Sequence, residues 1–169
     1  MDELDGRLLA LLHDEPRVGV LEASRRLGVA RGTVQARLDR LEARGVVTGW
    51  GPELDPAALG HPVTAFLSLE IRQAASGSGA EHGGHDAVAA HLATIPEVLE
   101  AHTTTGAGDL LVRVVARSNT DLQRVIDAVV ASDAVVRCST TIALATQVPY
   151  RTMPLAMAAG RSSGPAAGR

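Results

Sequence analysis

The chain has 169 residues and a formal net charge of −3, which excludes a uniformly basic nucleic-acid coat. Hydrophobic residues make up 46% of the chain but aromatic residues only 2%, so aliphatic side chains must fill the core of one or two domains. A single cysteine, Cys138, excludes an intramolecular disulfide and any zinc site built from several thiolates. No apolar run approaches the roughly 18 residues of a membrane span. The acidic opening "MDELDG" does not look like a signal peptide, so we expect a cytoplasmic protein.

The first sixty residues predict three helices. The first helix runs up to Pro16 and places four leucines on one stripe: Leu4, Leu8, Leu11 and Leu12. A short second helix covers residues 21–27 and ends at Gly28. The third runs from about Arg31 to Ala43, and its inward residues recur at helical spacing: Val34, Leu38 and Leu41. The following "VVTGWGPEL" predicts two short strands around a glycine-containing turn.

These elements, in this order, are typical of a helix-turn-helix followed by a wing. Residues 20–47 contain six arginines and three acidic residues, so positive charge is concentrated locally. The outward side of the third helix is small at Gly32 and Ala36, which favours a close approach to a duplex. We expect the DNA contacts to come from this helix and from the wing: Arg31, Gly32, Thr33, Gln35, Ala36, Arg37, Arg40 and Trp50. The alternative is a three-helix packing module with a solvated arginine face.

The second half predicts the order β-α-β-β-α-β. The expected strands are residues 63–72, 98–105, 109–116 and 135–146, and the expected helices are 86–94 and a segment through Val130 capped by Asn119 or Thr120. A Gly/Ser-rich stretch at 73–85 reads as a flexible loop. This order implies an α+β fold with a ferredoxin-like sandwich, in which two helices cover one face of a four-stranded antiparallel sheet. The strands look apolar on both sides, so we expect a homodimer through the open face.

The N-terminal segment strongly resembles the winged helix-turn-helix of the Lrp/AsnC (leucine-responsive regulatory protein/asparagine regulator) family of prokaryotic transcription factors. The resemblance rests on several features in order: the opening Leu-Asp, "PR" after the first helix, "RRLGV", "TVQARLDRLEARGVV", the Gly-Trp of the wing and "LDPAALG". The chain departs from the family pattern at Ala30, where the family favours serine, and at Ala23, where it favours leucine. Ala30 loses a helix-capping hydroxyl and Ala23 thins the core.

The second half resembles the family's ligand-binding and oligomerisation domain, the RAM (regulation of amino-acid metabolism) domain. The matching segments are "TTTGAGDLLVRV", which carries the family's Gly-x-x-Asp, and "STTIAL" on the last strand. The resemblance implies that a small effector, usually an amino acid, binds near these residues: Thr104, Gly106, Gly108, Asp109 and Thr140. Glycine N–H groups suit a carboxylate and an aspartate suits an ammonium group. The alternative is that "GAGD" is only a β-turn.

Together these features predict a winged helix-turn-helix domain over residues 1–60, a ferredoxin-like effector-binding and oligomerisation domain over 61–150 and a disordered tail over 151–169. The resemblance implies a DNA-binding transcriptional regulator whose dimers read a pseudo-palindromic site on double-stranded DNA. An effector would shift assembly toward or away from higher oligomers such as an octamer. We expect no enzymatic activity, no cofactor and no metal.

Two alternatives stay open at this stage. Tetrapyrrole-processing enzymes of the sirohaem decarboxylase type share this architecture, and His102 and Arg113 would be the candidate residues for holding a macrocycle. The other alternative is an effector-binding scaffold whose DNA-binding module is vestigial. Among the remaining residues, His82 and His85 are more typical of solvated loop histidines than of metal ligands, His91 reads as a satisfied core residue and Cys138 as buried and inert.

Overall fold

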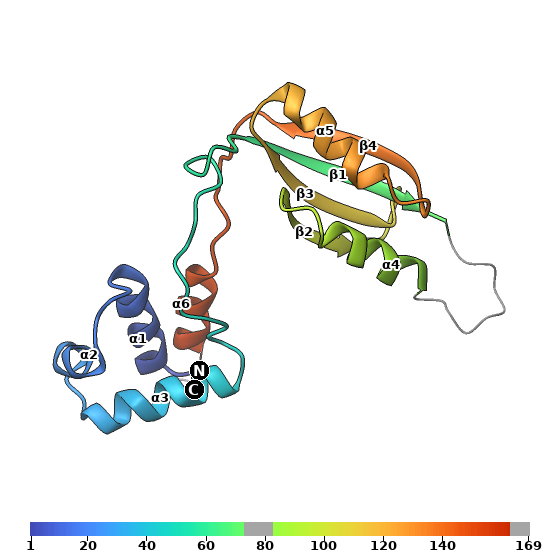
Figure 1. Ribbon diagram of the computed structural model, residues 1–169. Coiled ribbons are helices and arrows are strands. Elements are labelled where there is room, and N and C mark those ends of the chain that lie inside the picture. Colours follow the sequence, from blue (N-terminus) through green and yellow to red (C-terminus); the bar gives the residue numbers. More distant parts are fainter. Residues whose placement is uncertain (73–82, 163–169) are drawn as a thin grey trace, which may run out of the picture. The chain divides into compact units, whose positions relative to one another are not determined.

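The computed structural model describes residues 1–72 and 83–162 and divides into two compact units (Figure 1). The helical unit consists of Met1–Pro52 together with Val148–Arg169, and the sandwich unit consists of Glu53–Gln147. The chain therefore leaves the helical unit after Pro52 and re-enters it at Val148, whereas the sequence predicted a single passage at residue 60. None of the described helices is long and apolar enough to cross a membrane.

The helical unit contains the three predicted helices and one that was not predicted. They are α1 (Glu3–Asp14), α2 (Val20–Leu27), α3 (Arg31–Ala43) and α6 (Met153–Ser162). Their inward residues form a small aliphatic cluster of Leu8, Ala23, Val34 and Leu38. The leucine and valine stripes read from the sequence thus face one another as expected.

Local signals set the helix ends in this unit. Asp2 caps α1 through a capping box, in which Asp2 Oδ1 accepts from the Asp5 N–H and Asp5 Oδ2 accepts from the Asp2 N–H. Gly28 ends α2 at a φ of 68°, in the left-handed region that glycine enters without strain. Ala30 precedes α3 without a side-chain capping bond, as expected from its missing hydroxyl.

Two expectations for this unit are wrong. The expected disordered tail at 151–169 instead forms α6 over residues 153–162, and α6 packs on α1 (Figure 1). The two helices meet at glycines: a Cβ added to Gly160 would lie 3.5 Å from the Cα of Gly6, so their backbones approach closely. The expected wing strands do not form, since residues 46–54 contain no strand in the structure. Gly49, Gly51 and Pro52 disfavour a paired ladder there.

The sandwich unit has the predicted β-α-β-β-α-β order. Its strands are β1 (Val63–Ile71), β2 (Val98–Thr103), β3 (Leu110–Ala116) and β4 (Val135–Ala143), and its helices are α4 (Gly83–Leu92) and α5 (Asn119–Val130). The antiparallel sheet has the order β2-β3-β1-β4. Both helices pack on one face, and the core that they close contains Ala65, Leu67, Leu69, Ile71, Val88, Leu92, Ile95, Leu110, Val112, Val114, Ala116, Leu122, Val125 and Val129.

Details of this unit differ from the prediction. Ser118, not Asn119 or Thr120, caps α5, because its side chain accepts from the Asp121 N–H at 3.0 Å. The open face is not apolar throughout: β1 presents Phe66 there beside three polar residues, Thr64, Ser68 and Glu70. The Gly/Ser-rich loop lies outside the described residues over 73–82, and its last three residues begin α4.

Candidate functional site

The N-terminal half of α3 forms the exposed surface of the helix-turn-helix. The buried side of α3 is aliphatic at Val34, Leu38 and Leu41. The residues predicted to face DNA in this half are all exposed: Arg31, Gly32, Thr33, Gln35 and Ala36. Gln35 Nε2 donates to Asp39 Oδ1 at 2.8 Å, so reading a base would require Gln35 to exchange this bond.

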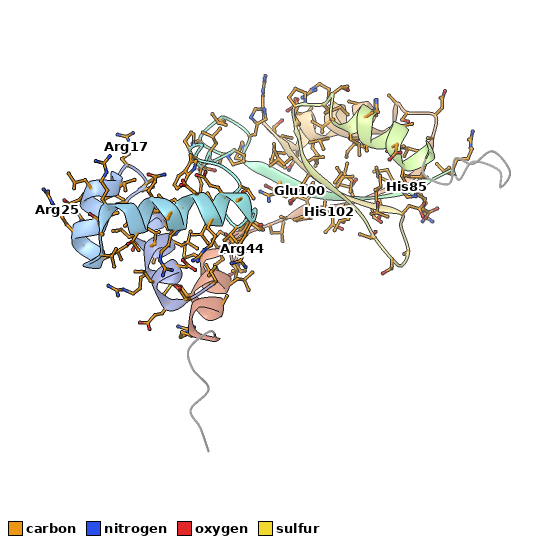
Figure 2. The ribbon with its side chains drawn as sticks, turned by 90° about the horizontal axis from the view of Figure 1, so that it is seen from below. Arg17, Arg25, Arg44, His85, Glu100 and His102 are labelled. Atoms are coloured by element: carbon orange, nitrogen blue, oxygen red, sulfur yellow. The ribbon has the colours of Figure 1, made fainter. Side chains whose placement is uncertain are left out.

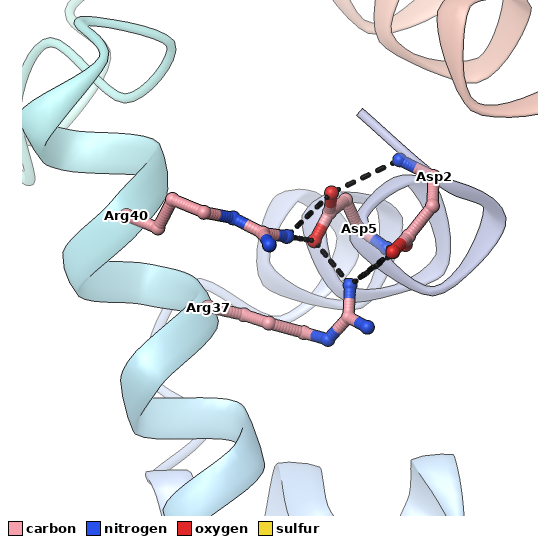
Figure 3. Close-up of polar contacts among 4 residues, drawn as sticks. All are labelled: Asp2, Asp5, Arg37 and Arg40. Atoms are coloured by element: carbon pink, nitrogen blue, oxygen red, sulfur yellow. Dashed lines mark hydrogen bonds and ion pairs between the residues drawn. The ribbon is translucent and has the colours of Figure 1, made fainter. Parts of the chain in front are cut away.

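The two other predicted DNA contacts on α3 are instead turned toward α1, where they form an ion cluster with Asp2 and Asp5 (Figure 3). Arg37 Nη1 donates to both carboxylate oxygens of Asp2 at 2.7 Å and to Asp5 Oδ1 at 2.6 Å. Arg40 Nη2 donates to the two oxygens of Asp5 at 2.9 and 3.0 Å. The side chain of Asp5 is 1% exposed, whereas those of Arg37 and Arg40 are 21% and 48% exposed.

The contacts of the ion cluster favour the charged forms of Asp2, Asp5 and Arg37. The hydrogen bond from Arg37 lowers the pKa of Asp2. Burial opposes ionisation of Asp5, but the hydrogen bonds from the Asp2 N–H and from Arg37 outweigh it, so the pKa of Asp5 also lies below its ordinary value. The same contacts raise the pKa of Arg37. Two guanidinium groups and two carboxylates compensate one another, so the cluster adds no net positive charge to the surface.

Uncompensated positive charge lies elsewhere on the helical unit. Arg17, Arg31 and Arg44 are exposed and have no carboxylate partner among the described residues. Figure 2 labels Arg17 and Arg44 and shows the side chain of Arg17 extending away from the unit. These arginines, rather than Arg37, are free to contact phosphate. Sequence analysis did not predict that Arg37 and Arg40 are paired with acidic residues. The equal three-residue spacings of Asp2 and Asp5 and of Arg37 and Arg40 could have indicated a four-residue cluster.

Trp50, the predicted contact of the wing, lies in the segment after α3. Its indole Nε1–H donates to Glu42 Oε1 at 2.6 Å, and its side chain is 56% exposed. This bond attaches the segment to the end of α3 in the absence of the expected strands.

The predicted effector residues fall mostly in the turn between β2 and β3. Thr104 closes the turn, because its N–H donates to the Asp109 carbonyl at 2.9 Å and its hydroxyl donates to the Gly108 carbonyl at 3.0 Å. Gly106 has a φ of 120°, which favours glycine. Asp109 ties the turn to β1, since its Oδ2 accepts from the Ile71 N–H at 2.7 Å.

Gly108 lies against β1, where a Cβ would collide with Ser68 Oγ. Ser68, which sequence analysis did not single out, is therefore the β1 side chain closest to this turn. Thr140 does not join the group: it lies on β4 opposite Leu67, so it shares the helix-covered side of the sheet with that residue. Among the described residues, the N–H groups of residues 105–108 have no hydrogen-bond acceptor.

The other residues considered from the sequence, which are histidine, arginine and cysteine side chains, do not form a common site among the described residues. His102 and Arg113 both contact Glu100, at 3.5 and 3.3 Å. Strand register places Glu100 and Arg113 on the open face of the sheet, opposite each other and beside Phe66; Figure 2 labels Glu100 and His102. His91 Nε2 bonds to the Ala128 carbonyl at 2.8 Å, as expected for a satisfied core residue. Cys138 is only partly buried, and desolvation raises the pKa of its thiol. His82 lies outside the described residues, within which no cluster of metal-ligating side chains occurs.

The geometry defines a class of protein: a helix-turn-helix unit joined to a ferredoxin-like sandwich. Residues 1–48 match the family model for winged helix-turn-helix DNA-binding domains, and residues 64–153 match the model for the Lrp/AsnC ligand-binding domain. The chain is 26% identical to the transcriptional regulator FL11 of Pyrococcus horikoshii over 92% of its length and 97% of that protein. It is 31% identical to the regulator AldR of Mycolicibacterium smegmatis over 73% of its length and 69% of that protein.

Comparison of structures agrees with these matches. The structure of Escherichia coli AsnC superposes with a TM-score of 0.78 at 26% identity, covering 91% of this chain and 99% of that one. The chain belongs to the Lrp/AsnC family of transcriptional regulators. It is a transcriptional regulator with a helix-turn-helix for DNA and a domain for a small-molecule ligand, as the sequence predicted.

Proposed function

We propose that the chain reads a specific site on double-stranded DNA with the exposed half of α3 and that an amino acid bound at the β2–β3 turn changes this binding. The observation that carries the DNA-binding part is the small, exposed, partly basic surface of α3 at residues 31–36. Gly32 and Ala36 allow close approach to the major groove, and Thr33 and Gln35 supply hydrogen-bonding groups. Arg31 and the other exposed arginines without a carboxylate partner among the described residues, Arg17 and Arg44, supply phosphate contacts. In this proposal Arg37 orients α3 and does not hold phosphate.

The effector part rests on the chemistry of the turn. The N–H groups of residues 105–108 lack protein acceptors in the described part of the chain, and such a row of N–H groups suits a carboxylate. Asp109 uses only Oδ2 for its bond to Ile71, which leaves Oδ1 for an ammonium group. A carboxylate and an ammonium group on one small molecule describe an amino acid. Ser68, rather than Thr140, would be the further contact.

We propose that the chain acts as a cytoplasmic homodimer that assembles further, and that it is not an enzyme. The open sheet face supports dimerisation through Phe66 and Leu111, which are 37% and 38% exposed next to polar groups that can pair across an interface. A dimer would present two α3 helices to two half-sites. The relatives named as transcriptional regulators favour this role over tetrapyrrole chemistry. The check is to incubate the protein with a tetrapyrrole and remove the unbound compound by gel filtration; the eluted protein should show no Soret band.

Selection of duplexes from a random pool by the full-length protein tests the DNA-binding proposal. We expect an enriched, pseudo-palindromic site. Arg31→Ala should make the negative slope of log K against log salt concentration shallower by about 0.9, because one phosphate contact is lost. Arg37→Ala should leave this slope unchanged. Failure to enrich any duplex contradicts the proposed function.

The effector proposal is tested on the enriched duplex with a panel of the amino acids. Asp109→Asn keeps an oxygen acceptor for the Ile71 N–H but removes the charge, so it should abolish the amino-acid response while DNA binding persists. Asp133→Asn, at an exposed position of the same unit, is the matched control. An Asp109→Asn protein that responds like the wild type would exclude this ammonium site.

A further inference from the structure

Helix α6 contacts the part of α1 that holds the recognition helix. A Cβ added to Gly160 would lie 3.3 Å from the Asp2 carbonyl oxygen, 3.5 Å from the Gly6 Cα and 3.8 Å from the Glu3 Cα. Gly6 in turn faces Gly160 and the carbonyl oxygen of Ala156. Later residues of α6 thus meet earlier residues of α1, so the two helices run antiparallel with the backbone of α6 pressed against the first turn of α1.

That first turn also carries both carboxylates of the ion cluster. Asp2 is the N-cap of α1 and Asp5 its third residue, and the capping box joins them. From there the two carboxylates reach Arg37 and Arg40 on α3 (Figure 3). A terminal helical turn frays unless packing holds it in place. In the described structure, α6 is the element whose backbone packs on this turn.

We propose that α6 is a positioning element for the recognition helix α3. By holding the first turn of α1, it fixes Asp2 and Asp5, and these fix the guanidinium groups of Arg37 and Arg40. The orientation of α3 relative to α1 is then set before DNA arrives, so less conformational entropy is lost on binding. This inference rests on the proposed function and extends it to a segment that the family model, which ends at residue 153, does not include.

The test uses the full-length chain and the duplex enriched by the wild-type protein. Gly160→Leu places a branched side chain where a Cβ alone would already lie 3.3 Å from the Asp2 carbonyl oxygen, without changing any charge, and should displace α6. We expect five- to tenfold weaker DNA binding and a shifted, broadened NMR signal of the Arg37 Nε–Hε group. Ala158→Leu, at an exposed position of the same helix, should stay within twofold of the wild type.

A double-mutant cycle separates positioning from a general loss of stability. If α6 acts through the ion cluster, Gly160→Leu and Asp2→Asn break the same link, so together they should weaken binding no more than the stronger single change. Effects that multiply, or an unchanged Arg37 signal in Gly160→Leu, would overturn the proposal. Should Gly160→Leu unfold the helical unit, as circular dichroism would report, Gly160→Val provides a smaller displacement, since its methyl groups extend past the Cβ toward Gly6 and Glu3. A two- to threefold loss of DNA binding is expected, and no loss would contradict the idea. A wild-type protein that enriches no duplex would instead remove the DNA-binding proposal itself.

Discussion

The helical unit and the sandwich unit are held together by different kinds of contact. The sandwich closes fourteen buried aliphatic residues between its sheet and its two helices, whereas the cluster of α1, α2 and α3 has four, one of them alanine. The helical unit compensates with directional contacts: the capping box, the ion cluster and the close approach of Gly6 and Gly160. A thin aliphatic core permits several helix orientations, and specific polar contacts select one of them. We therefore expect the two units to respond differently to the same kinds of change.

The largest effect should follow from removing core volume in the sandwich. Leu67 is fully buried on β1, and Leu67→Ala should cost about 3 kcal/mol because the cavity cannot collapse completely. Urea unfolding followed by circular dichroism measures the loss. Trp50, the single tryptophan, reports separately on the helical unit by fluorescence and should change much less. Leu99→Ala, at a 43% exposed position of β2, is the control. Equal shifts in both signals would show that the units unfold together.

The next largest effect should come from the ion cluster. Asp5→Asn removes the buried charge that both Arg37 and Arg40 contact and should destabilise the helical unit by about 2 kcal/mol, less than a fully buried pair because both arginines can turn toward water. The midpoint of the Trp50 fluorescence transition in urea measures this change. Asp14→Asn, at the exposed end of α1, should change that midpoint little. A stable Asp5→Asn protein would mean that the aliphatic cluster alone holds α3.

Lowering the pH should destabilise the helical unit through the same ion cluster. Because the folded-state pKa values of Asp2 and Asp5 lie below those of the unfolded chain, the folded state binds fewer protons. Their contribution is complete above about pH 5 and is lost as pH falls below about 4 and through the lowered folded-state pKa values. Thermal unfolding monitored at Trp50 should therefore shift downward between pH 5 and pH 3. In Asp5→Asn this acid shift should be smaller, and an undiminished shift would assign it to other carboxylates.

The smallest effect should come from restoring the cap of α3. Ala30→Ser adds a hydroxyl that can accept from a free N–H of the first turn, so it should stabilise the helical unit by about 1 kcal/mol. Ala43→Ser, at the other end of the same helix, offers no such bond and should be neutral or slightly destabilising. The Trp50 transition measures both variants. A gain from both would point to solubility rather than to capping.

The fold could be predicted because apolar periodicity and turn residues depend only on residues that are close in sequence. The stripe of Val34, Leu38 and Leu41 placed α3 at its observed bounds, and alternation with turn residues gave the order of the sandwich. Helix α6 was not predicted because its ten-residue sequence, "MPLAMAAGRS", contains Pro154 and Gly160 and is followed by a Gly- and Ser-containing end. Its stability comes from a contact with α1 that is remote in sequence.

The candidate site was predictable in part for the same reason. The exposed surface at residues 31–36 follows from helical periodicity alone. The pairing of Arg37 and Arg40 with acids more than thirty residues away does not follow from that periodicity, so both arginines were predicted to contact DNA. In the structure they bond to Asp5 on α1 instead. Likewise, Thr140 matched a family pattern, but sheet register places it on the side of Leu67 rather than beside Gly108.

The return of the chain into the helical unit has a consequence for biosynthesis. Helices α1, α2 and α3 leave the ribosome first, but their partner α6 follows only after the entire sandwich has been translated. At 5–20 residues per second this delay amounts to roughly 5–20 seconds. During that interval the nascent helices α1, α2 and α3 lack α6. The helical unit, although it emerges first, is therefore completed by the helix that is translated last.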